Sequence, residues 1–144
     1  MSNLVSLDNF KLNRDFNTFE GKIKWLGSSI RVYLVLGDNK SENAGHKALD
    51  TLNVLLKRQR QEDLEMRTFA ADELTDLANN WAEDDEEITE EDFANRICIL
   101  ELSVNTNGKY TAYFNTDNMF ADHAIVALMA GQNLLQFRGE RLFI

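Results

Sequence analysis

The stretch CILELSVNTNGKYTAYF, residues 98–114, decides the fold class of this chain. Both of its ends have the β-branched and aromatic content of strands. Between them lies Asn107-Gly108, the strongest short signal for a β-hairpin, because both residues tolerate a positive φ angle. We therefore predict a hairpin over residues 98–114. Cys98 is expected to be a small buried hydrophobe within it, because free cysteines are among the most buried residues.

Further strands are predicted toward both ends of the chain. They span residues 21–25, 30–35, 123–130 and 134–138. Leu26-Gly27-Ser28-Ser29 supplies the turn of the first pair, and Gly131-Gln132-Asn133 supplies that of the second. Residues 123–130 mix helix-favouring and strand-favouring side chains, and the hairpin signal that follows them favours a strand.

Helices are predicted between these strands, at about residues 42–57, 62–81 and 90–96. Ser41 is the expected N-cap of the first helix. Apolar residues at helical spacing should face inward: Ala48, Leu49, Leu52, Leu55 and Leu56 in the first helix, and Met66, Phe69, Ala70, Leu74, Leu77, Ala78 and Trp81 in the second. The acids of the second helix, Asp63 among them, are expected on its solvated face.

The third helix carries its own start signal. Thr89 can cap the backbone amide of Asp92, and Ile88 can pack against Phe93.

Together these elements predict an α+β fold, an antiparallel sheet with two long helices and one short helix packed on one face. A chain of 144 residues with 44% apolar residues is expected to form a single domain over residues 1–144. Residues 1–15 are a candidate N-terminal extension.

Charge is distributed very unevenly along the chain. Residues 61–95 hold fourteen of the 24 acidic residues and one basic residue, Arg67, a local net charge of −13. The other 109 residues hold fourteen basic and ten acidic residues, a net charge of +4. Such a block repels nucleic acid and anionic membranes and attracts basic proteins.

Several classes of protein do not fit the sequence. No apolar run approaches the roughly 20 residues that span a bilayer. Residues 1–8 lack the basic start and apolar core of a signal peptide. The single cysteine excludes an internal disulfide. We therefore expect a cytoplasmic protein without membrane contact.

Sites for metals, cofactors and nucleic acid are not expected. Two histidines and one cysteine, far apart, make no zinc pattern, and the acidic stretch lacks the spacing of a calcium loop. Glycine-rich phosphate loops and the nucleophile elbow are absent from the sequence. The one basic cluster, Lys57-Arg58-Gln59-Arg60, stands beside acids that compete with phosphate. His46 reads as an exposed polar residue.

Five groups of residues together resemble a bacterial family of small cytosolic domains of unknown function. These landmarks are Gly21-x-Ile23-x-Trp25-Leu26-Gly27, Asn79-Asn80-Trp81, Ile88-Thr89-x-x-x-Phe93, Asn107-Gly108 and Asp117-x-x-Phe120-x-x-His123-x-Ile125. The resemblance implies an α+β fold and offers no activity that can be carried over to this chain. Members of this kind look like immunity proteins encoded beside secreted toxins, including contact-dependent inhibition toxins. The N-terminal extension and the acidic stretch 83–87 depart from the family pattern.

The residues and the resemblance lead to one main hypothesis. The chain is expected to be an immunity protein that binds and neutralises a basic toxin domain, with nucleases as the expected class, because an acidic inhibitor can occupy their positive surface and associate fast. The predicted contact residues are Asp84, Asp85, Glu86, Glu87, Glu90 and Glu91, with Asp72, Glu73 and Asp76 as a second row. Trp81 could be an apolar anchor, although its spacing favours the core.

Two alternatives stay open at this point. The chain could be a small enzyme or ligand-binding domain that uses His123, with Asp117 or Asp122 orienting its imidazole. A structural role for His123 is favoured over this, because a His–Asp neighbour pair has little specificity without geometry. The chain could also be an acidic adaptor for some other basic protein.

Overall fold

The computed structural model of the protein describes residues 5–38, 43–82, 87–120, 124–130 and 133–140. Its strands are β1 (Lys11–Asn13), β2 (Thr18–Trp25), β3 (Ser28–Val35), β4 (Cys98–Asn105), β5 (Lys109–Asn115), β6 (Ala124–Ala130) and β7 (Asn133–Glu140). Its helices are the 3-10 helix η1 (Leu7–Asn9) and the α-helices α1 (Ala44–Lys57), α2 (Gln59–Trp81) and α3 (Glu90–Arg96). The predicted α+β class is confirmed.

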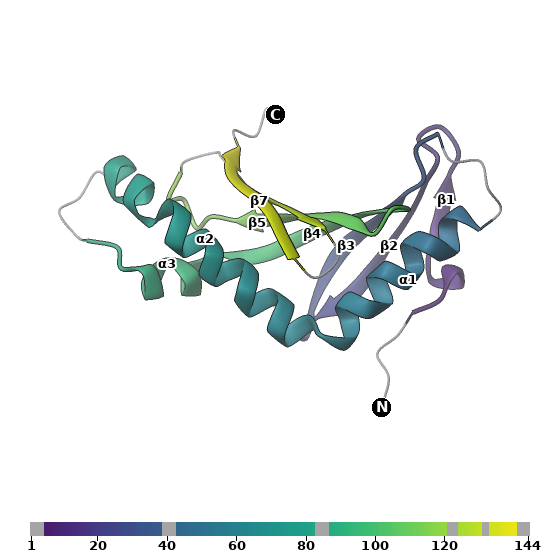
Figure 1. Cartoon of the computed structure of the whole chain (residues 1–144), viewed down its shortest axis with the longest axis horizontal. Helices are drawn as coiled ribbons and strands as arrows, with labels where there is room; N and C mark the ends of the chain where they lie inside the picture. The colour runs from purple at the N-terminus through teal and green to yellow at the C-terminus, as the bar shows by residue number, and fades with distance from the viewer. Residues whose placement is uncertain (1–4, 39–42, 83–86, 121–123, 131–132, 141–144) are drawn as a thin grey trace.

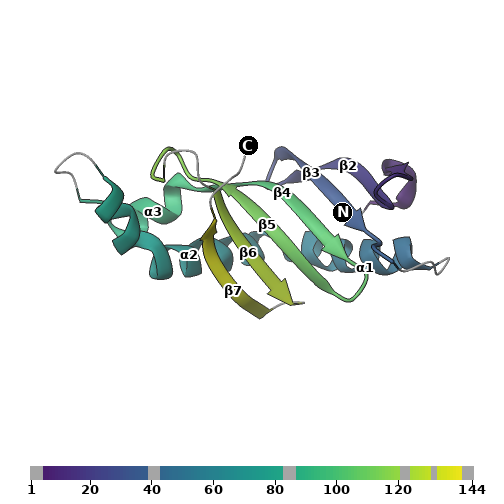
Figure 2. The ribbon, with the colours of Figure 1, turned by 90° about the horizontal axis from the view of Figure 1, so that it is seen from above.

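The seven strands form one sheet in the order in which they follow along the chain. Five neighbouring pairs are antiparallel, as predicted, whereas β3 and β4 are parallel. The parallel pair has a topological cause, because α1, α2 and α3 form the long connection that parallel neighbours require. The three helices lie on one face of the sheet (Figures 1 and 2).

Two of the three predicted turns with glycine are present, with different backbone geometry, and residues 131 and 132 of the third lie outside the described residues. Leu26 and Gly27, at φ angles of 49° and 87°, form the two-residue connection between β2 and β3. In the other hairpin, Gly108 alone of the Asn107-Gly108 pair takes a positive φ, of 86°. The Asn107 side chain instead accepts a hydrogen bond of 3.0 Å from the Lys109 amide. The predicted hairpin is therefore confirmed, with Asn107 acting through its side chain.

The beginning of the described chain is part of the domain. Strand β1 pairs with β2 at the edge of the sheet. The side chain of Asn53 in α1 accepts from the Val5 amide at 3.0 Å and donates to the Val5 carbonyl at 3.1 Å. This edge strand was not predicted, because its three residues are too few to show periodicity.

Helix α1 shows the predicted inward stripe, and all five of its predicted core residues are buried. The helix begins at Ala44 after an N-cap at Asn43, and the predicted N-cap Ser41 lies outside the described residues. Helix α3 begins as predicted, since the Thr89 hydroxyl accepts from the Asp92 amide at 3.0 Å. Phe93 is fully buried, and Ile88 packs against the core that contains it.

Helix α2 follows the prediction at Met66, Ala70, Leu74 and Ala78 and departs from it at Leu77 and Trp81. Met66 and Ala70 are buried, but Leu77 and Trp81 are each 41% exposed. Ala71 and Thr75, outside the predicted stripe, are buried instead. The helix has 23 residues and so a length of about 34 Å. The last turns of α2 extend beyond the sheet and pack on α3 (Figure 2). The side of the helix that is buried therefore changes along its length.

Two smaller features follow from the same architecture. Cys98 is exposed, which corrects the prediction of a buried thiol, because the alternation of β4 turns Ile99 to the core and Cys98 to the open face. His46 is exposed, as predicted. None of the helices in the described residues is long and apolar enough to cross a membrane.

We predict that Gly21→Ala lowers the free energy of unfolding by about 1–3 kcal/mol, the usual cost of overpacking. A Cβ atom at Gly21 would lie 2.7 Å from Phe10 Cδ2 and 3.0 Å from the Asn9 carbonyl oxygen. Urea unfolding measures the change. Lys22→Ala on the same strand, which truncates an exposed side chain, should change stability by less than about 0.5 kcal/mol. An unchanged midpoint for Gly21→Ala would contradict the close packing of η1 on β2.

Candidate protein-binding surface at the acidic pole

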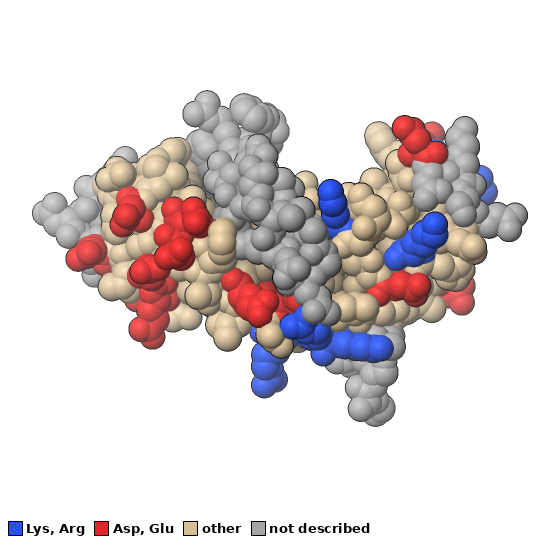
Figure 3. All heavy atoms as spheres, in the orientation of Figure 1, with Lys and Arg blue, Asp and Glu red and all other residues tan. Residues whose placement is uncertain are grey.

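Six predicted contact residues lie together at one end of the molecule. We call this surface the acidic pole, and its described members are Asp72, Glu73 and Asp76 on α2, Glu87 before α3, and Glu90 and Glu91 in the first turn of α3. All six are exposed. The space-filling view shows acidic side chains without basic ones over this end, whereas acidic and basic side chains are mixed over the middle and the opposite end (Figure 3). Asp84, Asp85 and Glu86 lie outside the described residues.

The carboxylates of the acidic pole have no basic partner among the described residues. The ion pairs there are Arg58–Glu62, Arg67–Asp63 and Arg96–Asp117, and none includes a member of the pole. The negative field of these groups is therefore not cancelled locally and extends into the solvent, where only salt screens it.

The two helices of the pole are fixed to each other by Asn79. Its side chain donates to the Ile88 carbonyl at 2.9 Å and accepts from the Ile88 amide at 2.7 Å. This pair of bonds joins the last turn of α2 to the residue that precedes the N-cap of α3. The carboxylates on α2 and α3 therefore keep a fixed relative position.

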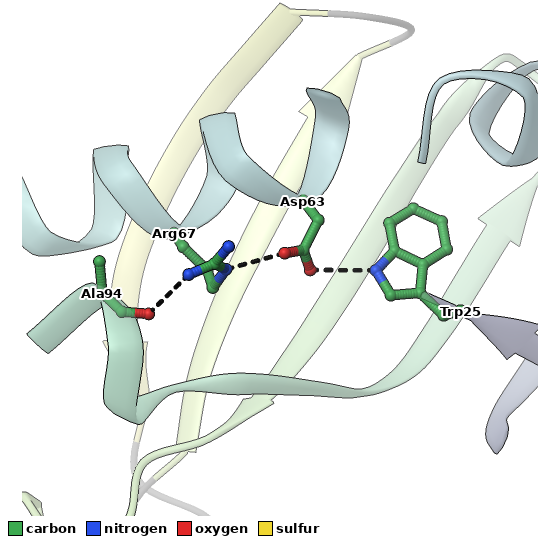
Figure 4. A network of polar contacts seen from close by, with 4 residues as sticks. All are labelled: Trp25, Asp63, Arg67 and Ala94. Carbon is green, nitrogen blue, oxygen red and sulfur yellow. Dashed lines mark hydrogen bonds and ion pairs between the residues drawn. The ribbon is translucent and has the colours of Figure 1, made fainter. Parts of the chain in front are cut away.

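Asp63, predicted on the solvated face, is in fact buried, and it anchors α2 to the sheet. Its Oδ1 accepts from Trp25 Nε1 at 3.0 Å, and its Oδ2 lies 2.8 Å from Arg67 Nε (Figure 4). Arg67 Nη1 also donates to the Ala94 carbonyl of α3 at 3.0 Å. One carboxylate thereby connects β2, α2 and α3.

Glu62, the neighbour of Asp63, is a second buried acid. Its Oε2 accepts from the Tyr110 hydroxyl at 2.9 Å, and Arg58 Nη1 lies 3.4 Å from its Oε1. Burial raises the pKa of the Glu62 carboxyl, and the Tyr110 hydrogen bond and the charge of Arg58 oppose that shift only in part. Burial and the adjacent Glu62 raise the pKa of Tyr110 as well. Glu62 and Asp63 thus serve the fold, whereas Asp72, Glu73 and Asp76, farther along α2, are exposed to solvent.

An aromatic group supports the exposed end of α2. The Trp81 ring meets Phe120 edge-on at a centroid distance of 5.7 Å, and Phe120 meets Phe93 in the same way at 6.1 Å. Phe120 and Phe93 are buried, whereas Trp81 is partly exposed. The core role predicted for Trp81 is therefore only half correct, since one part of the ring packs and another reaches solvent.

The turn that carries Phe120 is held by an ion pair. Asp117 and Asn118 take φ angles of 49° and 62°, which are unusual for residues other than glycine. Arg96 at the end of α3 binds Asp117 through Nε–Oδ2 at 2.9 Å and through Nη2 to its carbonyl oxygen at 3.1 Å. Landmarks from three distant parts of the sequence, Asn79–Trp81, Ile88–Phe93 and Asp117–Phe120, therefore meet beside the acidic pole.

The same turn bears on the catalytic alternative. Asp117, one of the two acids proposed to orient His123, binds Arg96 instead, and Asp122 and His123 lie outside the described residues. A hollow of about 450 Å³ lies beside β1, at the opposite end of the molecule, and its lining does not include Asp117. No group of three metal-ligating side chains occurs within the described part of the chain.

Comparison with known proteins identifies a family. Residues 5–138 match the family described as "Uncharacterized protein conserved in bacteria (DUF2262)". The chain belongs to this bacterial family. No curated protein and no solved structure matches it. The expected resemblance to a bacterial family of unknown function is thus confirmed, and the immunity role remains a matter for proposal.

We predict that Glu62→Gln alters the pH dependence of stability. The raised pKa makes the folded protein keep the Glu62 proton at a pH where the unfolded chain has lost it. The stabilising effect of that proton is complete below the unfolded pKa and is lost as pH rises through the folded one. Glutamine still accepts a hydrogen bond from Tyr110 but does not ionise, so it does not lose stability as pH rises. The free energy of unfolding of Glu62→Gln relative to wild type should therefore rise with pH above about 4.5.

Urea unfolding at pH values between 4.5 and 8 tests this prediction. Glu62→Ala is the matched variant, because it removes both the charge and the acceptor and leaves the Tyr110 hydroxyl unpaired, at a cost of about 1–3 kcal/mol. A constant difference between Glu62→Gln and wild type over the whole range would show that Glu62 titrates as an ordinary exposed carboxyl.

Proposed function

We propose that this chain is a cytoplasmic immunity protein that binds a cognate basic toxin domain, of the nuclease class, through the acidic pole. One observation carries the proposal. Six exposed carboxylates, five on α2 and α3 and one just before α3, have no ion-pair partner among the described residues, while the buried acids of α2 are paired with bases of the same chain. An unpaired surface of one sign is suited to a partner of the opposite sign.

A nuclease domain supplies that sign, because it presents Lys and Arg to the phosphates of its substrate. An acidic surface of comparable extent can cover such residues and exclude the nucleic acid. The attraction also steers the two proteins together, which raises the association rate constant far above its neutral value. Fast association suits an inhibitor that must capture a toxin before it acts.

The rigidity of the pole supports the same function. The Asn79 bonds and the Arg67 link to Ala94 hold α2 and α3 in one arrangement, and the Thr89 cap fixes the first turn of α3. A surface that is ordered before binding loses little conformational entropy when it binds. An acidic adaptor for another basic protein would use the same surface, and the identity of the neighbouring gene product separates the two functions.

We predict that the triple variant Asp72→Asn, Glu73→Gln, Asp76→Asn folds normally but associates more slowly with the toxin domain encoded beside this chain's gene, prepared as a catalytically inactive variant. The association rate constant should fall about tenfold or more at low salt and approach the wild-type value near 0.5 M salt, since exposed charges act mainly on association and are screened by salt. Stopped-flow or surface-based kinetics at several salt concentrations measure both effects.

A matched control separates local charge from total charge. Asp15→Asn, Asp38→Asn, Asp50→Asn removes three exposed carboxylates away from the pole and so changes the net charge equally. It should associate almost as fast as wild type and protect cells from the neighbouring toxin. Equal effects of the two triple variants would contradict binding through the acidic pole. A neighbouring toxin domain that does not bind wild type would contradict the immunity function.

A further inference from the structure

We propose that Leu77 and Trp81 form the apolar anchor of this interface. They would pack against a partner surface in which an apolar patch is bordered by Lys or Arg side chains. The inference rests on the proposed function for the nature of the partner, a basic protein. It adds where on the acidic pole the partner is held and which contact sets the lifetime of the complex.

The two side chains form a continuous exposed surface. They are four residues apart on α2, so they are neighbours on one face of the helix. Each is 41% exposed, whereas Leu74 and Ala78, at the inward positions of the same turns, are buried. Large apolar side chains that remain exposed beside a complete core often mark an interaction site, and Trp is the residue most enriched among contacts that dominate binding.

Trp81 is also held in position before any partner arrives. Its ring packs edge-on against Phe120, which is 4% exposed and packs in turn on Phe93. The turn that carries Phe120 is fixed by Arg96 and Asp117. A partner that covers the exposed part of Trp81 therefore gains apolar contact without ordering the ring.

The surrounding charges define the chemistry of the partner. Glu73 precedes Leu77 by one helical turn, and Asp76 is its neighbour in sequence. Ile88, two residues before the first turn of α3 with Glu90 and Glu91, is hydrogen-bonded to Asn79 at the same end of α2. An apolar centre with an acidic border excludes anionic ligands and fits an apolar patch with a basic border.

A pair of charge-matched variants tests the anchor. Leu77→Lys places a cation at the proposed centre, whereas Leu64→Lys makes the same chemical change at a leucine of α2 that is 56% exposed outside the acidic pole. Binding to the inactive toxin domain encoded beside the gene is followed by kinetics. Leu77→Lys should raise the dissociation rate constant about thirtyfold or more, the effect of a dominant contact. Leu64→Lys should leave it within about twofold.

Intrinsic fluorescence gives a second readout that needs no disruptive substitution. The chain has two tryptophans, of which Trp25 is 2% exposed and Trp81 is 41% exposed. Acrylamide should therefore quench mainly Trp81 in the free protein. A toxin domain without tryptophan, obtained by Trp→Phe substitution where needed, should protect this emission on binding. Trp81→Phe, which retains a ring against Phe120, should abolish the protected signal.

The outcomes separate this inference from the proposed function. Suppose that binding depends on Asp72, Glu73 and Asp76, but Trp81 stays open to acrylamide in the complex and Leu77→Lys dissociates as slowly as Leu64→Lys. The anchor is then wrong, and the acidic interface stands. If wild type does not bind the toxin domain, both fail. Protection of Trp81 together with fast dissociation of Leu77→Lys supports the anchor.

Discussion

The arrangement of helices and sheet in this molecule depends on the interactions of one buried carboxylate, that of Asp63. A charge removed from water is tolerated only when it is paired and hydrogen-bonded, and Asp63 meets both conditions through Trp25 and Arg67. Arg67 also donates a hydrogen bond to the Ala94 carbonyl of α3. The position of α3 therefore depends on the Asp63 carboxylate as well. Loss of Asp63 would leave the Arg67 guanidinium and the Trp25 indole without their partner, so the cost would spread over three elements. The position of the acidic pole is therefore set by contacts in the core of the protein.

Local patterns in the sequence were sufficient for the elements themselves. Alternation, helical spacing, the Thr89 cap and the glycine turns predicted the hairpins, both long helices and the start of α3. They did not predict which acids are buried. Asp63 and Trp25 are 38 residues apart, and Glu62 and Tyr110 are 48 apart. Only the fold brings them together, although Asp63, three residues before Met66 and seven before Ala70, does lie on the helix face that carries the apolar stripe. Composition alone assigns a carboxylate to solvent, since unpaired acids are rarely buried.

The candidate surface was predictable in part for a related reason. The exposure of Asp72 and Asp76 follows from the helical pattern, because they lie away from its apolar stripe, whereas Glu73 lies one turn before Leu77 on the face of the stripe. The exposure of Leu77 and Trp81 does not, since the stripe assigns them to the core. A periodic pattern assumes that the helix meets one flat partner along its whole length. Helix α2 instead leaves the sheet and continues over α3, so its buried face turns, and residues at the end of the predicted stripe reach the surface.

The bases of the chain are distributed in a way that gives the acidic pole its character. Arg58 and Arg67 neutralise the two buried acids at the start of α2, and Arg96 is engaged by Asp117. The carboxylates beyond them therefore have no such neighbour, and they repel one another in the free protein. Salt relieves this repulsion and should favour the isolated fold, but the same screening weakens attraction to a basic partner. A partner that supplies Lys and Arg side chains offsets the repulsion among these carboxylates directly. The relief of this repulsion is then part of the free energy of binding.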